Sequence, residues 1–203
     1  MKYDYRFEDP DYIYSDPVTG ILRNKHGIED EQLLQVTESL ETSKRLEELE
    51  QKPIKIKSAE TLLDIHKYLF KDLYDWAGEV RQVNINKQGK PFLSVTSFAA
   101  GFAYINILIN EYRCSDDSDI SVLSRRLARI LDSINYLHPF REGNGRTQRE
   151  FIRVLALEKG YRLILNPPDD RDVYERYMQG TIEGDIDLLA LLIETIINEE
   201  KLK

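Results

Sequence analysis

The sequence is poor in the residues that build disulfide-rich or cysteine-based metal folds. It has 203 residues, of which one is cysteine (Cys114) and three are histidine. A single cysteine excludes an internal disulfide and a zinc site made of several cysteines. We therefore expect a chain that works in a reducing cytosol.

Long apolar runs and basic runs are absent too. No segment approaches the ~18 uninterrupted apolar residues of a membrane span, and the N-terminal stretch "MKYDYRFEDPDY" lacks the apolar run of a signal peptide. The chain has 28 Lys and Arg against 36 Asp and Glu, a net charge of -8. This balance gives no general attraction to nucleic acid or to anionic membranes, so we expect neither as a direct partner.

The chain does have enough apolar residues for a core, with 41% hydrophobic and 32% charged residues. Its length and the lack of repeats or low-complexity linkers predict one domain over 1–203. Residues 1–20 contain the turn-forming stretches "DP" and "DPVTG", so we expect this segment to be irregular.

Helical periodicity dominates the rest of the chain. The strongest apolar stripe has members every three or four residues, with Asp117 or Ser118 as the expected cap. Its members are Ile120, Leu123, Leu127, Ile130, Ile134 and Leu137. Weaker patterns run through Leu62–Trp76, Phe98–Tyr112, Gly145–Lys159 and onward from about Asp185. The prediction is a mainly α fold, a helical bundle.

One segment, 80–94, breaks this rhythm. In "VRQVNINKQGKPFLS" Val83 and Ile85 alternate, Gly89 occupies a turn, and the pattern resumes at Phe92. This is typical of a small β-hairpin. Pro91 cannot donate a ladder hydrogen bond, so its strand should lie at an edge.

The stretch "HPFREGNGRTQRE" follows the strongest stripe directly. Pro139 disfavours helical geometry for the residue before it, so the helix should end at about His138. Gly143 and Gly145 then let backbone N–H groups converge where a second helix starts, an arrangement that favours phosphate. The Asn144 amide is a further donor.

The charges of this stretch suit bound phosphates. Arg146 and Arg149 are three residues apart on one helical face, and a charge-assisted hydrogen bond is worth roughly 1.5–3 kcal/mol. Glu142 is a lone carboxylate in the place where Mg²⁺ would join phosphates. His138 is the nearby group whose pKa suits proton transfer near neutral pH. The stretch is neither a Walker loop nor a dinucleotide fingerprint.

Taken separately, these features favour ordinary structural roles, because glycine turns often only start helices and surface arginines are usually solvated. It is their occurrence in one register that favours function. His66 lies on an apolar face between Leu62 and Leu69, which is typical of a core histidine. Glu41 and Glu47 are most simply part of a solvated helix face.

The complete stretch resembles the Fic-domain motif H-P-F-x-[DE]-G-N-G-R-x-x-R at all nine specified positions. The segments "TGILRNKHGIEDEQLL", "IHKYLFKDLYDWAGEVRQVNINKQG" and "YERYMQGTIEGDIDLLALLI" extend the resemblance to compact bacterial Fic toxins over nearly the whole chain. The resemblance implies the Fic fold, with residues 138–149 as active-site loop and helix start.

It also implies transfer of AMP from ATP to a Ser, Thr or Tyr hydroxyl of a target protein. By this resemblance His138 is the base, and Glu142 holds Mg²⁺. The ATP-binding residues would be Gly143, Asn144, Gly145, Arg146 and Arg149, with Tyr174 and Tyr177 either at the adenine or in buried packing. The hairpin matches the family's flap, which would dock the target through Lys87, Gly89 and Phe92.

Many Fic proteins carry an inhibitory helix, [ST]-x-x-x-E-[GN], whose glutamate occupies the second motif arginine. Here Thr37–Glu41 is followed by Thr42, Ser43–Glu47 by Glu48, and Thr195–Glu199 by Glu200, so none completes it. The resemblance therefore favours a separate small antitoxin that supplies the glutamate. A degenerate internal helix around Ser43–Glu47 is the alternative.

Other activities of the same fold stay open. A Doc-type kinase has a lysine at the position of Gly145, which argues against that branch, whereas transfer of UMP leaves no readable sign in the base pocket. A nucleotide-binding regulatory module would not need His138 and Glu142. By family resemblance the target is an ATPase subunit of a type II topoisomerase in the bacterial cytoplasm.

Overall fold

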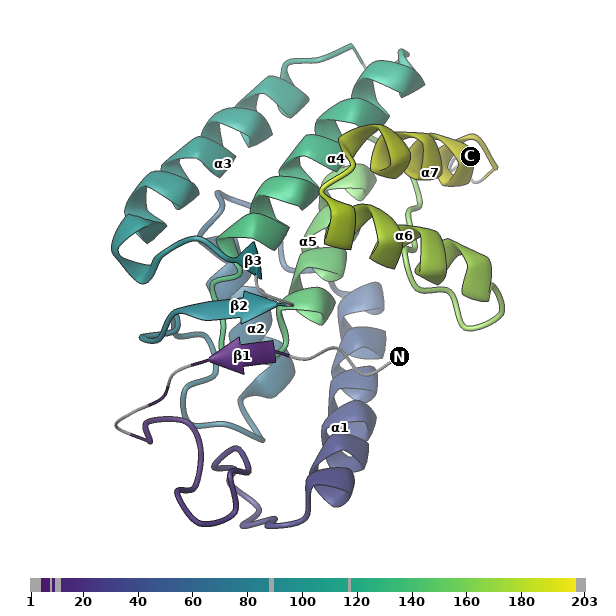
Figure 1. Cartoon of the computed structure of the whole chain (residues 1–203). Coiled ribbons are helices and arrows are strands. Elements are labelled where there is room, and N and C mark those ends of the chain that lie inside the picture. Colours follow the sequence, from purple (N-terminus) through teal and green to yellow (C-terminus); the bar gives the residue numbers. More distant parts are fainter. Residues whose placement is uncertain (1–4, 8, 10–11, 88–89, 117, 200–203) are drawn as a thin grey trace.

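The computed structural model describes residues 5–7, 9, 12–87, 90–116 and 118–199. Its described helices are α1 (Glu31–Gln51), α2 (Thr61–Phe70), α3 (Phe98–Arg113), α4 (Ile120–Leu137), α5 (Asn144–Glu158), α6 (Arg171–Glu183) and α7 (Ile186–Glu199). A 3₁₀ turn covers Val95–Ser97. The predicted mainly α bundle is confirmed (Figure 1). None of the described helices has the length and apolarity needed to cross a membrane.

Helix α4 is the centre of the bundle, because α3, α5 and α7 all pack against it. The stripe that predicted this helix is its buried face, including Leu127, Ile130 and Ile134. Its N-cap is Asp119, whose side chain accepts from the Val122 amide at 3.1 Å. The expected cap at Asp117 or Ser118 was wrong, because the helix begins at Ile120, directly after Asp119.

Two other expectations need correction. The stripe Leu62–Trp76 is not one helix, since α2 ends at Phe70 and the Leu73 and Tyr74 amides both donate to the Phe70 carbonyl in a turn. Leu73 is still fully buried, so the apolar spacing correctly indicated a buried position but not a continuous helix. Residues 1–20 are not wholly irregular either, because Tyr5–Phe7 forms strand β1.

The hairpin at 80–94 is present as β2 (Ile85–Lys87) and β3 (Lys90–Pro91). Strand β1 pairs antiparallel with β2, which gives a three-stranded sheet in the order β1-β2-β3. Pro91 lies in an edge strand, as predicted. Gly89 lies outside the described residues. Strand β1 satisfies the backbone groups along one side of β2 that would otherwise have no protein partner. Figure 1 shows this small sheet in front of the ends of α4 and α5.

His66 is the core histidine that its position predicted. It is fully buried, and its ring stacks on Phe140 with centroids 3.8 Å apart and planes 9° from parallel. The Gly78 amide donates to Nδ1 at 2.8 Å, so Nε2 carries the proton and donates to the Glu142 carbonyl at 3.0 Å. The side chain thereby ties α2 to the loop between α4 and α5.

Burial lowers the pKa of His66 to about 3 from 6.5. Between these values the unfolded chain binds a proton at this side chain and the folded chain does not. The free energy of unfolding should therefore fall as pH drops through this window, with a limiting slope of about 1.4 kcal/mol per pH unit from this group. Urea unfolding of wild type and His66→Gln over this pH range should show a shallower slope in the variant.

Equal slopes for wild type and His66→Gln would contradict the assignment of this acid sensitivity to His66.

Candidate active site

The backbone reverses where α4 ends. His138 is the C-cap of α4, has φ 42° and ψ 60°, and donates its amide hydrogen to the Ile134 carbonyl at 3.0 Å. The predicted helix end is therefore confirmed. A left-handed conformation is uncommon for a residue other than glycine, and it persists only where the surroundings hold it. His138 is thus a rigidly placed side chain, with only 7% of its surface exposed.

The His138 ring has a defined tautomer. Nδ1 lies 3.3 Å from the Asn135 carbonyl, which can only accept, so Nδ1 carries the hydrogen. Nε2 is then the nitrogen with a lone pair that can take up a proton. Phe92 stacks on the ring, with centroids 3.7 Å apart and planes 10° from parallel. Stacking covers the face of the imidazole, whereas the lone pair lies in the ring plane.

The loop after His138 is closed by its own asparagine. Asn144 Nδ2 donates to the Phe140 carbonyl at 2.8 Å, and its Oδ1 accepts from the Phe140 amide at 2.9 Å. The side chain that we expected to face phosphate is therefore used within the loop, which leaves its backbone N–H for an anion.

Gly143 is the glycine that the loop geometry requires. It has φ 82°, and a Cβ there would lie 2.3 Å from the Phe70 ring. Gly145 is less constrained, because a Cβ there would meet only the end of the Arg149 side chain, at 3.2 Å. Gly143 is also the N-cap of α5, and it has no side chain that could accept from the first amides of the helix. These amides and the helix dipole suit a phosphate.

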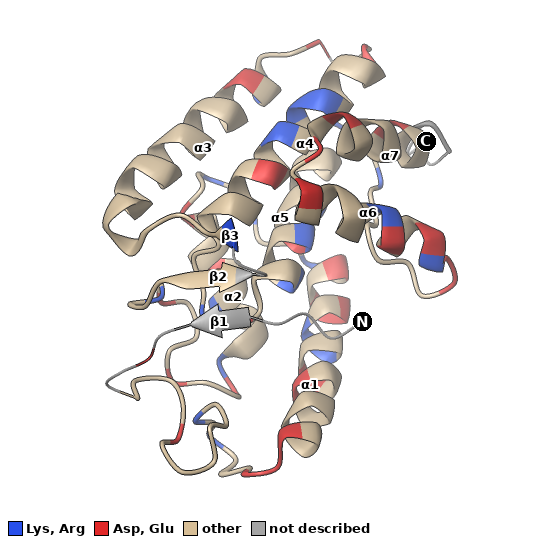
Figure 2. Ribbon diagram, viewed as in Figure 1, with Lys and Arg blue, Asp and Glu red and all other residues tan. Residues whose placement is uncertain are grey.

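The two motif arginines point to different partners. Arg146 pairs with Glu38 of α1, donates to Thr42 Oγ1 at 3.2 Å, and lies 3.5 Å from Glu142 Oε1. Figure 2 shows acidic positions along α1 and basic positions in the first turns of α5. The residue missed by the sequence analysis is Glu38. The sequence feature that could have indicated Glu38 is its position four residues after Leu34 and four before Thr42, on the buried face of α1.

Arg149 lies instead beside α6. Its guanidinium carbon is 5.7 Å from the Tyr174 ring centroid and 5.5 Å from that of Tyr177. Tyr177 is 1% exposed, and its hydroxyl lies 2.5 Å from Gln148 Nε2, so its ring is part of the buried packing. Tyr174 is partly buried. The structure thus brings both tyrosines to Arg149.

Glu142 has the chemistry of a metal ligand. Its side chain is 41% exposed, and Oε1 accepts from the Gly143 amide at 2.8 Å. Among the described residues no three His, Cys, Asp or Glu side chains gather as a metal site. A cation here would therefore take Glu142 together with oxygens of a nucleotide and water, which is how Mg²⁺ commonly binds.

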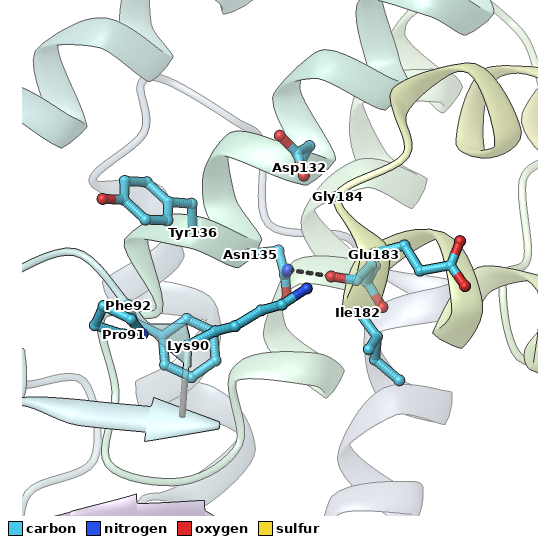
Figure 3. Close-up of a pocket in the computed structure, with 10 residues that line it drawn as sticks. Lys90, Pro91, Phe92, Asp132, Asn135, Tyr136, Ile182, Glu183 and Gly184 are labelled. Atoms are coloured by element: carbon cyan, nitrogen blue, oxygen red, sulfur yellow. Dashed lines mark hydrogen bonds between the residues drawn. The ribbon is translucent and has the colours of Figure 1, made fainter. Parts of the chain in front are cut away.

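A pocket of about 330 Å³ opens beside Phe92, between the flap, α4 and the end of α6. Figure 3 shows Lys90 and Phe92 along one side and Asn135 and Glu183 opposite. Asp132 also lines it, and burial raises the pKa of this carboxyl. The pocket adjoins His138 through two of its lining residues. Phe92 stacks on the His138 ring, and the Asn135 carbonyl contacts His138 Nδ1. Of the expected flap residues, the structure places Phe92 at the site; for Lys87 it describes the strand position.

Comparisons with known proteins relate the chain to one family. Residues 56–156 match the Fic/DOC family. Protein adenylyltransferase VbhT of Bartonella schoenbuchensis is 35% identical over 96% of this chain and 41% of its own length. The probable protein adenylyltransferase Fic of Escherichia coli is 30% identical over 94% of this chain and 93% of its own length. The chain thus spans less than half of VbhT but nearly all of the E. coli protein.

A solved structure supports the fold. BepC of Bartonella tribocorum, crystallised with AMPPNP, superimposes with a TM-score of 0.79 at 22% identity, covering 91% of this chain and 96% of that one. The match over residues 56–156, which include the loop between α4 and α5, and the near full-length similarity to the E. coli protein show that this chain belongs to the Fic/DOC family.

Proposed function

We propose that this Fic-family enzyme transfers AMP from ATP to a hydroxyl side chain of a target protein, with His138 as the base. The observation that carries the proposal is the 3.3 Å contact between His138 Nδ1 and the Asn135 carbonyl, beside the start of α5. This contact favours Nε2 as the nitrogen that accepts a proton. Neither ATP nor AMP binding alone would need a proton acceptor in that place.

The reaction is a displacement at phosphorus. His138 Nε2 takes the proton of the target hydroxyl, whose oxygen bonds to the α-phosphorus of ATP. The bond from this phosphorus to the bridging oxygen breaks, and pyrophosphate leaves with that electron pair. The first amides of α5, after Gly143, bind phosphate oxygens, and Arg149 is near enough to this helix start to contact the γ-phosphate. Mg²⁺ held by Glu142 would neutralise charge on the phosphates.

The nucleoside has a place beside the phosphates. The pocket next to Phe92 is within the volume range of small-molecule sites, roughly 300–1,000 Å³, and Asn135 and Thr181 line it. We assign it to the adenosine half of ATP. Tyr174 and Tyr177 then support Arg149 from α6 rather than form the base pocket themselves.

The target docks on the flap as an added strand. Strand β1 already pairs with β2. On the other side, Pro91 offers a carbonyl but no N–H, and the Leu93 amide is bonded to the Tyr136 carbonyl at 2.9 Å. A target strand therefore adds at the short edge of β3 or takes the place of β1.

Inhibition comes from a separate antitoxin in this proposal. Glu47 is exposed, and among the described residues Arg149 contacts aromatic rings rather than a carboxylate. The carboxylate of α1 that reaches the motif is Glu38, which pairs with Arg146. Arg149 is thus available to a partner's glutamate. By family resemblance the target is a type II topoisomerase subunit in the bacterial cytoplasm.

His138→Ala should abolish transfer while ATP binding stays within a few-fold of wild type, because loss of a general base typically costs ~10²–10⁴ in rate. The measurement uses ATP labelled at either the α- or the γ-phosphorus, a topoisomerase ATPase subunit and a bacterial lysate. The α label on protein indicates AMP transfer, and the γ label would indicate a kinase. Wild-type transfer by the variant would remove His138 from the base role.

Phe92→Ala should raise the KM for the protein target several-fold, because the flap loses its contact beside the base. ATP affinity should change less, because Phe92 is one of the ten residues that line the pocket assigned to adenosine. Tyr104→Ala, at an exposed residue of α3, serves as the matched surface control. A fall in ATP affinity with unchanged target KM would show that Phe92 serves only the adenosine pocket that it lines, and would reject its role in target docking.

The isolated chain should transfer AMP without any activating change, since the sequence contains no complete inhibitory motif. Rates of wild type, Glu47→Gly and Glu38→Gln with ATP and Mg²⁺ test this. A silent wild type that Glu47→Gly activates would show internal inhibition by the Ser43–Glu47 segment. Activation by Glu38→Gln would place the inhibitor at the Arg146 pair. Either result would disprove the separate antitoxin.

A further inference from the structure

Arg81 is the most unusual buried side chain outside the motif. It is 1% exposed and donates three short hydrogen bonds, all to backbone carbonyls. Nε reaches the His138 carbonyl at 2.8 Å, Nη1 reaches Val83 at 2.6 Å, and Nη2 reaches Leu93 at 2.6 Å. A planar guanidinium can serve these acceptors at once, which a lysine ammonium cannot do with the same fork geometry.

The surroundings of Arg81 make this arrangement costly. Its guanidinium carbon lies 4.9 Å from the Phe98 ring centroid, and its hydrogen bonds end on the partial negative charge of carbonyl oxygens. Burial lowers the pKa of Arg81 to about 10, so the side chain is still charged at neutral pH. A buried charge held by carbonyl oxygens is a poor way to gain stability compared with an apolar side chain. The arrangement therefore calls for another role.

The acceptors belong to segments that have to be in register for transfer. His138 is the proposed base, and its carbonyl direction belongs to the left-handed turn that ends α4. Val83 precedes β2, and Leu93 follows β3, so the two carbonyls mark the two feet of the flap. The Arg81 amide also donates to the Pro139 carbonyl at 2.7 Å. One residue thus joins both feet of the flap to the base.

We infer that Arg81 is a positioning residue that sets the flap in register with His138. Through it, a target strand bound to the flap is carried at a set distance from Nε2, and the Phe92 ring is kept on the imidazole. Arg81 touches neither phosphate nor target in this scheme. The inference rests on the proposed function for its kinetic meaning, but the joint itself can be observed without turnover.

Histidine NMR provides the turnover-independent test. The chain has three histidines, so the imidazole signals of His26, His66 and His138 can be assigned by single substitutions. Ring stacking shifts the His138 proton signals, and Phe92→Ala marks their position without the stack. In Arg81→Lys these signals should move most of the way to that position, whereas the His66 signals should stay. Unmoved His138 signals in folded Arg81→Lys would overturn the inference.

Kinetics supply a double-mutant cycle. Arg81→Lys should lower kcat by about 10²-fold, the scale of a misplacement of about 1 Å, with ATP affinity within a few-fold of wild type. Adding Phe92→Ala should then cost little more, because both changes break one joint. The matched control is Arg153→Lys, a partly buried arginine of α5 that donates to the Leu49 carbonyl at 3.1 Å. Its effect should multiply with that of Phe92→Ala.

The outcomes separate the two proposals. If the wild-type chain transfers no AMP but Arg81→Lys still shifts the His138 signals, the proposed function is rejected and the joint is kept. If the effects of Arg81→Lys and Phe92→Ala on kcat multiply, the joint is rejected and the proposed function is kept. Arg81→Gln is the second variant should Arg81→Lys fail to fold. Failure of both to fold would overturn the inference, since Arg81 would then be needed for the fold itself.

Discussion

The turn between α4 and α5 depends on its backbone carbonyls being held from outside the turn and from within it. Arg81 holds the His138 carbonyl, and His66 holds that of Glu142. Asn144 closes the turn by bonding both backbone groups of Phe140. A buried carbonyl without a donor is costly. Backbone conformations of the turn that would break any of these bonds are therefore disfavoured. His138, the proposed base, and the start of α5 are therefore placed by a rigid frame rather than by a surface loop.

Helices and motif were predictable because their signals are local. The stripe from Leu123 to Leu137 predicted the buried face of α4, and Pro139 predicted where it ends. The motif predicted which side chains lie near the turn. It did not predict how they are used, since Asn144 bonds within the loop and Arg146 pairs with α1.

What the sequence could not show depends on contacts between distant segments. Glu38 and Arg146 are 108 residues apart, and Arg81 and His138 are 57 apart, so periodicity has no access to either pair. Strand β1 was missed for a related reason. Three residues beside turn-forming prolines carry little strand signal, and it is the edge of β2 that provides their hydrogen-bonding partners.

The pairing of β1 with β2 gives the flap a built-in competitor. A segment of the same chain faces its site at a high effective concentration, which a separate peptide does not share. A target strand that takes the place of β1 has to exceed that concentration through its own affinity, and backbone pairing alone gives it no advantage over an equally extended segment of this chain. The flap would then favour target proteins that make further contacts with this chain in addition to strand pairing. The pairing of β1 with β2 would in this way set a minimum affinity, which a cognate target exceeds and an arbitrary exposed peptide does not.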